Sequence, residues 1–134
     1  MNSNRYSQLC ILLSRIEDTD NPDLNLDADI AEACGFIVDR EHYHRYTQEW
    51  SPTIQNWQGC NKHPLPTFTD SMDAVLILID HTLPELLIRV SNEYMGFWRA
   101  TVGLSQGKGK RTAPLALLCA LLRALIAMES ARDV

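Results

Sequence analysis

Residues 113–130 are apolar almost all the way around a helix, and this segment most constrains the fold. Leucine and alanine fill most of its positions, and Pro114 stands in the first turn, where a helix needs no amide donor. A helix without a polar face must be buried on nearly every side. One sheet face cannot cover it, so we expect either a helix over residues 5–17 or a second subunit to pack beside it. We favour a homo-oligomer.

Length and charge narrow the class of protein. A chain of 134 residues predicts a single domain, residues 1–134, that buries a core without disulfides or a metal. The net charge of −5 argues against binding to duplex nucleic acid. Residues 1–8 are too polar for a signal peptide, and the apolar run 113–122 is shorter than the roughly 20 residues that cross a bilayer. We therefore expect a cytoplasmic protein without membrane contact.

Apolar spacing and capping residues predict the helices. The pattern indicates amphipathic helices over residues 5–17 and 26–34, and Gly35 suits the C-cap of the second. A third helix begins after the candidate N-cap residues Thr69, Asp70 and Ser71 and ends before Pro84.

Alternating apolar residues predict a hairpin over residues 85–102, with a turn at 92–96. The expected core face of this hairpin is Leu86, Ile88, Val90, Trp98, Ala100 and Val102. Residues 105–111 are expected to form a loop, and residues 39–66 irregular strands with long loops. This order of elements predicts an α+β fold in which helices flank an antiparallel sheet, an α-β-α sandwich.

The segments TFTDSMDAVLIL (67–78), LLIRVSNEYMGFWRATVG (86–103) and RTAPLALLCALLRAL (111–125) carry a family resemblance. Together they resemble the phage ABA-sandwich domain family, small proteins of bacteriophages and prophages. The resemblance extends over residues 67–128 and more weakly over 24–35. It implies a helix–sheet–helix architecture and a phage or prophage origin, hence the host cytoplasm. It implies no catalytic residues.

A cationic segment precedes the apolar helix and suggests an anion site. Lys108, Lys110 and Arg111 would neutralise a phosphate or carboxylate, and Thr112 with the amides of the first helical turn would donate hydrogen bonds. The alternative is a solvated basic loop. The segment lacks the order and spacing of a P-loop.

Arg89, Arg99 and Trp57 are further candidate ligand contacts. If Val90 faces Trp98 across the hairpin, then Arg89 faces Arg99, and two opposed like charges favour an anion between them. A register slipped by two residues, or acidic partners from the long loop, would remove this argument. Trp57 is either a stacking platform for a base or a packing residue under a loop.

Four residues have spacings that suggest a third possibility, a zinc site. They are His42, His44, Cys60 and His63. The spacing is not that of a standard finger, and ordinary surface histidines are the simpler interpretation. We expect no metal and no cofactor.

No catalytic motif is present: the chain has no GxSxG, no HExxH and no reactive Cys/His pair. We therefore expect a non-enzymatic protein. The leading hypothesis is capture of an anionic small molecule, such as a nucleotide-type signal of host antiviral defence, as a form of counter-defence. The alternative is a protein-interaction module that inhibits a host factor or takes part in phage assembly. That module would use an exposed apolar patch formed by Leu87, Phe97, Leu117 and Leu121.

Overall fold

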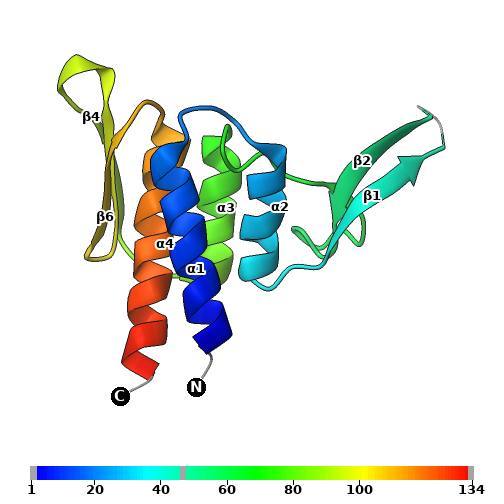
Figure 1. The fold of residues 1–134 in the computed structure, drawn as a ribbon, viewed down its shortest axis with the longest axis horizontal. Helices are drawn as coiled ribbons and strands as arrows, with labels where there is room; N and C mark the ends of the chain where they lie inside the picture. Colours follow the sequence, from blue (N-terminus) through cyan, green and yellow to red (C-terminus); the bar gives the residue numbers. More distant parts are fainter. Residues whose placement is uncertain (1–2, 46–47, 133–134) are drawn as a thin grey trace.

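The computed structural model describes residues 3–45 and 48–132, and in that part the chain forms four α-helices and two three-stranded antiparallel sheets (Figure 1). The elements are α1 (Ser3–Asp18), α2 (Leu24–Ala33), β1 (Val38–His44), β2 (Glu49–Ile54), β3 (His63–Pro64), α3 (Met72–Thr82), β4 (Ile88–Asn92), the 3₁₀ turn η1 (Tyr94–Gly96), β5 (Trp98–Val102), β6 (Ser105–Lys110) and α4 (Ala113–Arg132). The predicted α+β class, with antiparallel strands packed against helices, is confirmed. The layers differ from the predicted α-β-α sandwich, because two sheets flank the helices instead of helices flanking one sheet. The strands divide into an N-terminal sheet, β1-β2-β3, and a C-terminal sheet, β4-β5-β6.

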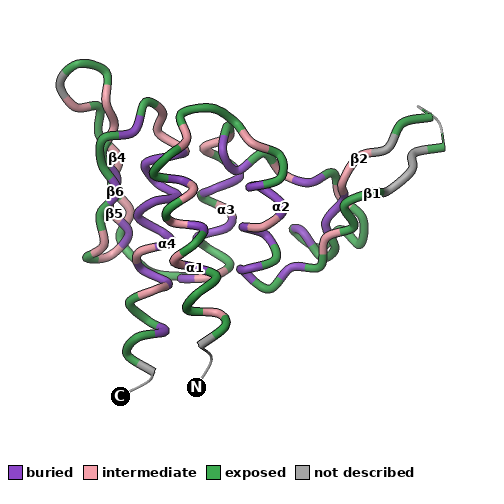
Figure 2. Tube along the Cα trace, in the orientation of Figure 1, coloured by how far each residue is buried: buried purple, intermediate pink, exposed green. Residues whose placement is uncertain are grey.

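The helices occupy the middle of the molecule, with one sheet on either side (Figure 1). Helix α4 packs against α1, α3 and all three strands of the C-terminal sheet. Residues 115–122 are almost completely inaccessible to solvent, and Figure 2 shows the buried residues gathered along α4 and the neighbouring helix faces. Of the two alternatives for covering α4, packing of the first helix beside it is the one observed, and α4 needs no second subunit to cover it. The homo-oligomer stays a prediction.

By length and composition α4 resembles a membrane span, the single such helix in the described part of the chain. Most of the segment Ala113–Ala131 is buried inside the protein. This burial is what the core helix of a soluble protein shows.

The C-terminal sheet contains a strand where a loop was predicted. Residues 105–110 form β6, which pairs with β5 and packs on α4. The approach is close because Gly107 has no side chain: a Cβ there would lie 2.2 Å from the carbonyl oxygen of Ala116 and 2.6 Å from the Cβ of Cys119. Small residues on both elements therefore let strand and helix meet backbone to backbone.

The predicted core face of the hairpin is partly correct. Ala100 and Val102 are buried, whereas Ile88, Val90 and Trp98 are half-buried. Leu86 is 41% exposed and does not belong to the core. It precedes β4, where the chain has not yet entered the sheet.

Residues 39–66 form the N-terminal sheet and its connections. β1 and β2 pair as an antiparallel ribbon with an irregularity between Asp39 and His42, and the short β3 joins only the end of β2. Behind this end, the ring of Trp57 packs edge-on against Phe36 and Phe68, with centroid distances of 5.4 and 5.5 Å. The aromatic cluster fixes the sheet to the body of the protein.

Two hydrogen bonds join the start of α2 to the segment before α3. The carboxylate of buried Asp27 accepts a hydrogen bond from the backbone N–H of Thr69 at 2.8 Å, and the Thr69 hydroxyl accepts one from the N–H of Asp23 at 2.9 Å. Asp23 and Ser71 are the N-caps of α2 and α3. Burial raises the pKa of Asp27 to about 6, above its ordinary 3.8.

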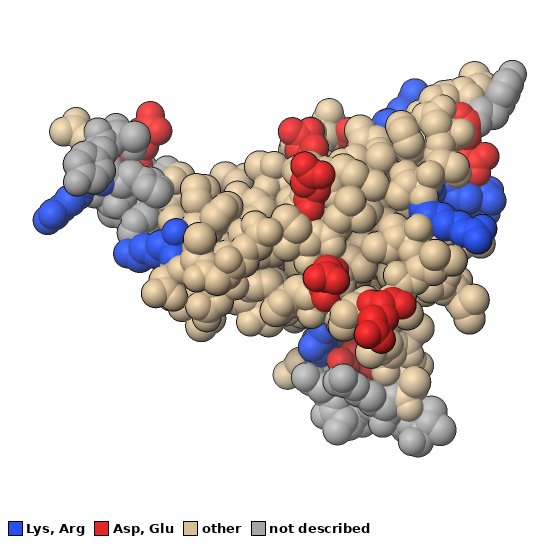
Figure 3. Space-filling model, turned by 180° about the vertical axis from the view of Figure 1, so that it is seen from behind, with Lys and Arg blue, Asp and Glu red and all other residues tan. Residues whose placement is uncertain are grey.

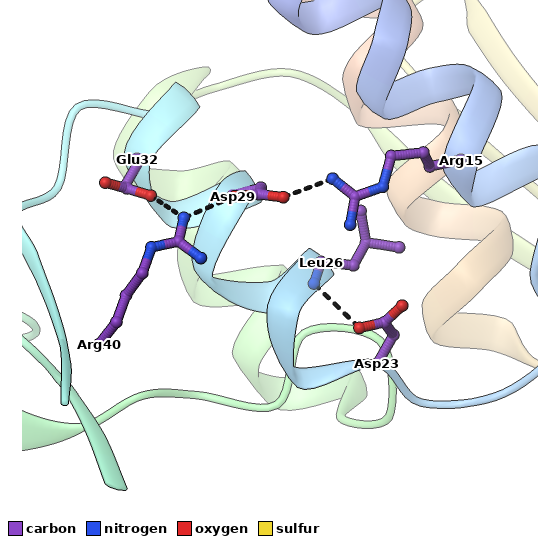
Figure 4. A network of polar contacts seen from close by, with 6 residues as sticks. All are labelled: Arg15, Asp23, Leu26, Asp29, Glu32 and Arg40. Carbon is purple, nitrogen blue, oxygen red and sulfur yellow. Dashed lines mark hydrogen bonds and ion pairs between the residues drawn. The ribbon is translucent and has the colours of Figure 1, made fainter.

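An ion-pair network joins three elements (Figure 4). Asp29 on α2 pairs with Arg15 on α1 and with Arg40 on β1, and Arg40 also pairs with Glu32. Partial burial alone would raise the pKa of Asp29, but the hydrogen bonds from the two arginines outweigh it and lower the pKa. The network ties the N-terminal sheet to the helices.

Candidate binding surface on the C-terminal sheet

The C-terminal sheet turns one face to α4 and the other to solvent. Its inner face includes the row Val90, Ala100 and Gly107. Alternate residues point outward, and the outward rows are Arg89, Thr101 and Gln106, then Ser91, Arg99 and Lys108. We call the exposed Arg89, Arg99 and Lys108 the cationic sheet face.

Basic side chains lie mainly toward the ends of the molecule. In Figure 3 they are seen at the two sheet ends, each with acidic side chains nearby, and further acidic side chains lie over the helices between them. The cationic sheet face lies on a chain whose net charge is −5.

The predicted opposition of Arg89 and Arg99 is wrong, because the hairpin register is slipped by two residues. Arg89 faces Thr101, and Arg99 faces Ser91. On its other side Arg99 faces Lys108 of β6, so the sheet still opposes two like charges. Glu93 forms an ion pair with Arg99 at 2.6 Å. Among the described residues, no acidic side chain pairs with Arg89 or Lys108.

A fourth cation and three apolar residues border the face. The guanidinium of Arg111 lies over the ring of Phe97, 4.6 Å from its centroid, in a cation–π contact. Leu87 is 63% exposed, and Leu104 in the β5–β6 turn is fully exposed. The apolar patch predicted from the sequence is only partly present, because Leu117 and Leu121 are buried in α4.

Lys110 does not belong to this surface, contrary to the prediction. Its side chain is buried, and the Nζ atom donates hydrogen bonds to the carbonyl oxygens of Glu17 and Thr19, with Asp20 at 3.6 Å. The β5–β6 register passes from Lys108 to Lys110 and leaves Gly109 out as a bulge with φ +74°. This bulge sends the two lysines to opposite faces of the sheet.

The start of α4 offers few free amides to the anion site predicted there. The Thr112 hydroxyl accepts a hydrogen bond from the N–H of Leu115 at 3.4 Å, and the Thr112 carbonyl accepts one from the N–H of Ala116 at 3.2 Å. Pro114 has no N–H to offer. The protein's own oxygens therefore occupy the amides of Leu115 and Ala116.

Trp57 lies apart from the other predicted ligand contacts. It is 3% exposed, follows the N-terminal sheet, and packs against Phe36 and Phe68. Of its two sequence interpretations, packing under a loop is the one observed. The structure brings Arg89, Arg99 and Lys108 together on the C-terminal sheet, with Arg111 at its border, and leaves Trp57 in the turn after β2 of the N-terminal sheet.

The predicted zinc ligands fall partly outside the described residues, because the side chains of His42 and His44 are not described. The register places His42 opposite Ser51 and His63 opposite Ile54, about 10 Å apart along β2. The Nδ1 atom of His63 lies 2.6 Å from the carbonyl oxygen of Pro64. The described residues contain no cluster of three metal-binding side chains.

Strand β6 completes the cationic sheet face, and two sequence signals could have indicated it. Gly103 and Leu104 form a two-residue connection directly after a strand, which is typical of a hairpin. Residues 106–110 then alternate with period two between glycine and a long polar side chain.

No family model, curated protein or solved structure matches this chain. The resemblance to the phage ABA-sandwich family therefore stays a prediction.

Proposed function

We propose that this protein acts by binding, and that the cationic sheet face takes an acidic surface of a partner protein. One observation carries the proposal. Three cationic side chains lie on an open sheet face, and only Arg99 has an acidic partner on the described part of the chain. An acidic partner would supply the missing counter-charges.

The shape of the face favours a protein over a small molecule. Small ligands bind in concave sites, whereas Arg89, Arg99 and Lys108 lie on the outward rows of a sheet. The face is a sheet surface bordered by exposed Leu87 and Leu104. Apolar contacts beside arginine are typical of protein–protein interfaces.

The edge of the sheet supports the same partner class. Within the described residues β4 pairs with β5 alone, so its other edge presents backbone donors and acceptors. An extended acidic segment could pair with β4 through its backbone and set its carboxylates against Arg89. Binding of this kind would cover the partner's surface and inhibit it without chemistry.

The two buried cysteines, Cys34 and Cys119, offer no support for an enzyme. Burial raises the pKa of Cys34 to about 12 and that of Cys119 to about 11, so neither thiol ionises at neutral pH. With the resemblance to phage proteins, the proposed role is inhibition of a host factor in the host cytoplasm.

The second candidate is an anionic small molecule such as a nucleotide-type signal. Arg99 and Lys108 face each other across β5 and β6, so one phosphate group could bridge the two cations. This candidate uses the same face and differs in the ligand.

Isothermal titration calorimetry at low ionic strength separates the two candidates. The probes are an octaglutamate peptide and a cyclic dinucleotide. We expect octaglutamate to bind, and the double variant Arg89→Glu/Lys108→Glu to weaken it at least tenfold. The control Lys62→Glu changes an exposed lysine near the N-terminal sheet and should bind like the wild type.

Heat with the dinucleotide alone would establish the second candidate instead. If neither probe gives heat, the proposed surface is refuted. An equal loss of octaglutamate affinity in the double variant and in Lys62→Glu would refute it as well.

A further inference from the structure

A concave feature lies beside the N-terminal sheet, on the opposite side of the helices from the cationic sheet face. A hollow of about 420 Å³ opens between the C-terminal part of α3 and the turn that follows β2. Its volume falls in the range of about 300–1,000 Å³ that small-molecule sites occupy. We call it the aromatic hollow; its lining is Phe36, Asn56, Trp57, Gln58, Leu76, Ile77, Asp80 and His81.

The turn after β2, which forms one wall of the hollow, contains two residues with left-handed backbone. Asn56 and Gln58, on either side of Trp57, have φ values of +58° and +51° in the left-handed region that side chains disfavour. The turn is held by hydrogen bonds from Gln55 N to Ile37 O and from Cys60 N to Trp57 O, each 3.0 Å. Strained non-glycine backbone that the surroundings hold in place gathers at ligand sites.

The lining sets the chemical class of the ligand. Its walls are mostly apolar, with Trp57 and Phe36 on one side and Leu76 and Ile77 of α3 on the other. Asp80 supplies the one carboxylate, and no lysine or arginine lines the hollow. A carboxylate beside aromatic rings suits a cation attached to an apolar group, and it repels an anion.

The hollow extends past His81. A smaller hollow of about 190 Å³ shares Phe36, Asn56 and His81 with it. The His81 ring packs on Phe36 with a centroid distance of 4.5 Å, and both residues line the two spaces. The exposed Ile37 lines the smaller space and would contact the far end of a longer ligand.

From this geometry we propose that the aromatic hollow binds a small amine carried on an aromatic group. The ring would lie among Trp57, Leu76 and Ile77, and the ammonium group would meet the Asp80 carboxylate. The amide side chains of Asn56 and Gln58 would contact polar substituents. This site is independent of the cationic sheet face and takes ligands of the opposite charge.

Calorimetry on the full chain tests this site with tryptamine and with indole-3-propionate, which replaces the ammonium by a carboxylate. We expect tryptamine to bind at least tenfold more tightly than indole-3-propionate. Asp80→Asn should reduce this preference at least fivefold, and Leu76→Arg should abolish tryptamine binding. Both positions are exposed, so the variants should fold, which circular dichroism checks.

The matched control is Asp73→Asn, the same substitution on an exposed position of the same helix outside the hollow. It should bind tryptamine like the wild type, as should Arg89→Glu/Lys108→Glu. No heat with tryptamine, equal affinity for the two probes, or equal effects of Asp80→Asn and Asp73→Asn would overturn the proposal.

Discussion

The Nζ atom of Lys110 lies 3.1 Å from the carbonyl oxygen of Glu17 and also donates to the carbonyl of Thr19, so β6 caps the C-terminal end of α1. Carbonyls at a helix end lack intrahelical partners, and a cation there also meets the negative end of the helix dipole. A lysine that looked like a ligand contact in the sequence is therefore a structural link between the first helix and the last sheet.

Replacing this lysine should destabilise the fold. Lys110→Met keeps the apolar stem but leaves two carbonyl oxygens without their donor, at a cost of about 2–3 kcal/mol in the free energy of unfolding. Lys108→Met, two residues away on the exposed face, should change it by less than about 0.5 kcal/mol. Urea denaturation measures both, and equal values for the two variants would show that Lys110 is not the link described here.

Gly107→Ala should disrupt the packing of β6 on α4. The new Cβ would lie 2.2 Å from the backbone oxygen of Ala116, and backbone cannot move aside as a side chain can. We expect a loss of about 3 kcal/mol or more. Gly109→Ala is the comparison, because no atom lies within 4 Å and only its φ of +74° opposes a side chain. That variant should lose about 1 kcal/mol. Thermal unfolding of the two variants measures these losses. A larger loss of stability in Gly109→Ala than in Gly107→Ala would refute the close packing of β6 on α4.

Asp27 should make the protein less stable as the pH rises from 4 to 6. The folded state keeps the proton of Asp27 up to about pH 6, whereas the unfolded chain releases it near 3.8. The folded state thus binds more protons in this window, and the free energy of unfolding falls as the pH increases. The difference of about two pKa units corresponds to a decrease of at most about 3 kcal/mol in the free energy of unfolding.

The variant Asp27→Asn isolates this contribution, because asparagine still accepts the Thr69 N–H but carries no charge. The wild type and the variant should differ little at pH 4, and the variant should be the more stable one at pH 7. Unfolding curves at both pH values check this. A difference that does not change with pH would mean that the Asp27 carboxyl has an ordinary pKa.

The cations of the sheet face should matter little for stability. Arg89→Glu/Lys108→Glu changes exposed side chains without ion pairs on the described chain, so the free energy of unfolding should shift by about 0.5 kcal/mol or less for each substitution. Denaturation of the double variant measures the shift. A loss of several kcal/mol would assign these residues a structural role.

Asp29→Asn should loosen the attachment of the N-terminal sheet. The substitution weakens the contacts to Arg15 and Arg40, whose side chains are about two-fifths exposed, so solvent screening limits the loss to about 1 kcal/mol. Because the pKa of Asp29 is lowered, its contribution is present at neutral pH and disappears in acid. Hydrogen exchange should become faster at the amides of β1 and stay unchanged in α4. Unchanged exchange in β1 would contradict this role of the network.

Local patterns were enough to predict the helices. The apolar spacing and the cap residues place the third helix after Ser71, which the structure confirms as its N-cap. The first helix and the apolar last helix also lie where they were expected, because helical periodicity and capping act within a few residues. The packing of α1 on α4 was one of two alternatives that burial left open, the other being a second subunit.

What the sequence did not predict depends on contacts between distant elements. The hairpin register, slipped by two residues, preserves the alternation of faces, so the apolar pattern of β4 and β5 cannot distinguish the two registers. The burial of Lys110 requires β6 to lie beside the end of α1, more than 90 positions earlier in the chain. For the site, the sequence identified the cations Arg89, Arg99, Lys108 and Arg111, but not their arrangement on one sheet.

Nuclear magnetic resonance of the full chain during titration with octaglutamate tests the binding surface most directly. We predict that the amides of residues 88–92, 98–102 and 105–108 shift together, and that rising salt reverses the shifts. The amide resonances of residues that line the aromatic hollow should not shift. If the shifts were absent or scattered over the helices and the N-terminal sheet, the cationic sheet face would not be the binding surface of this protein.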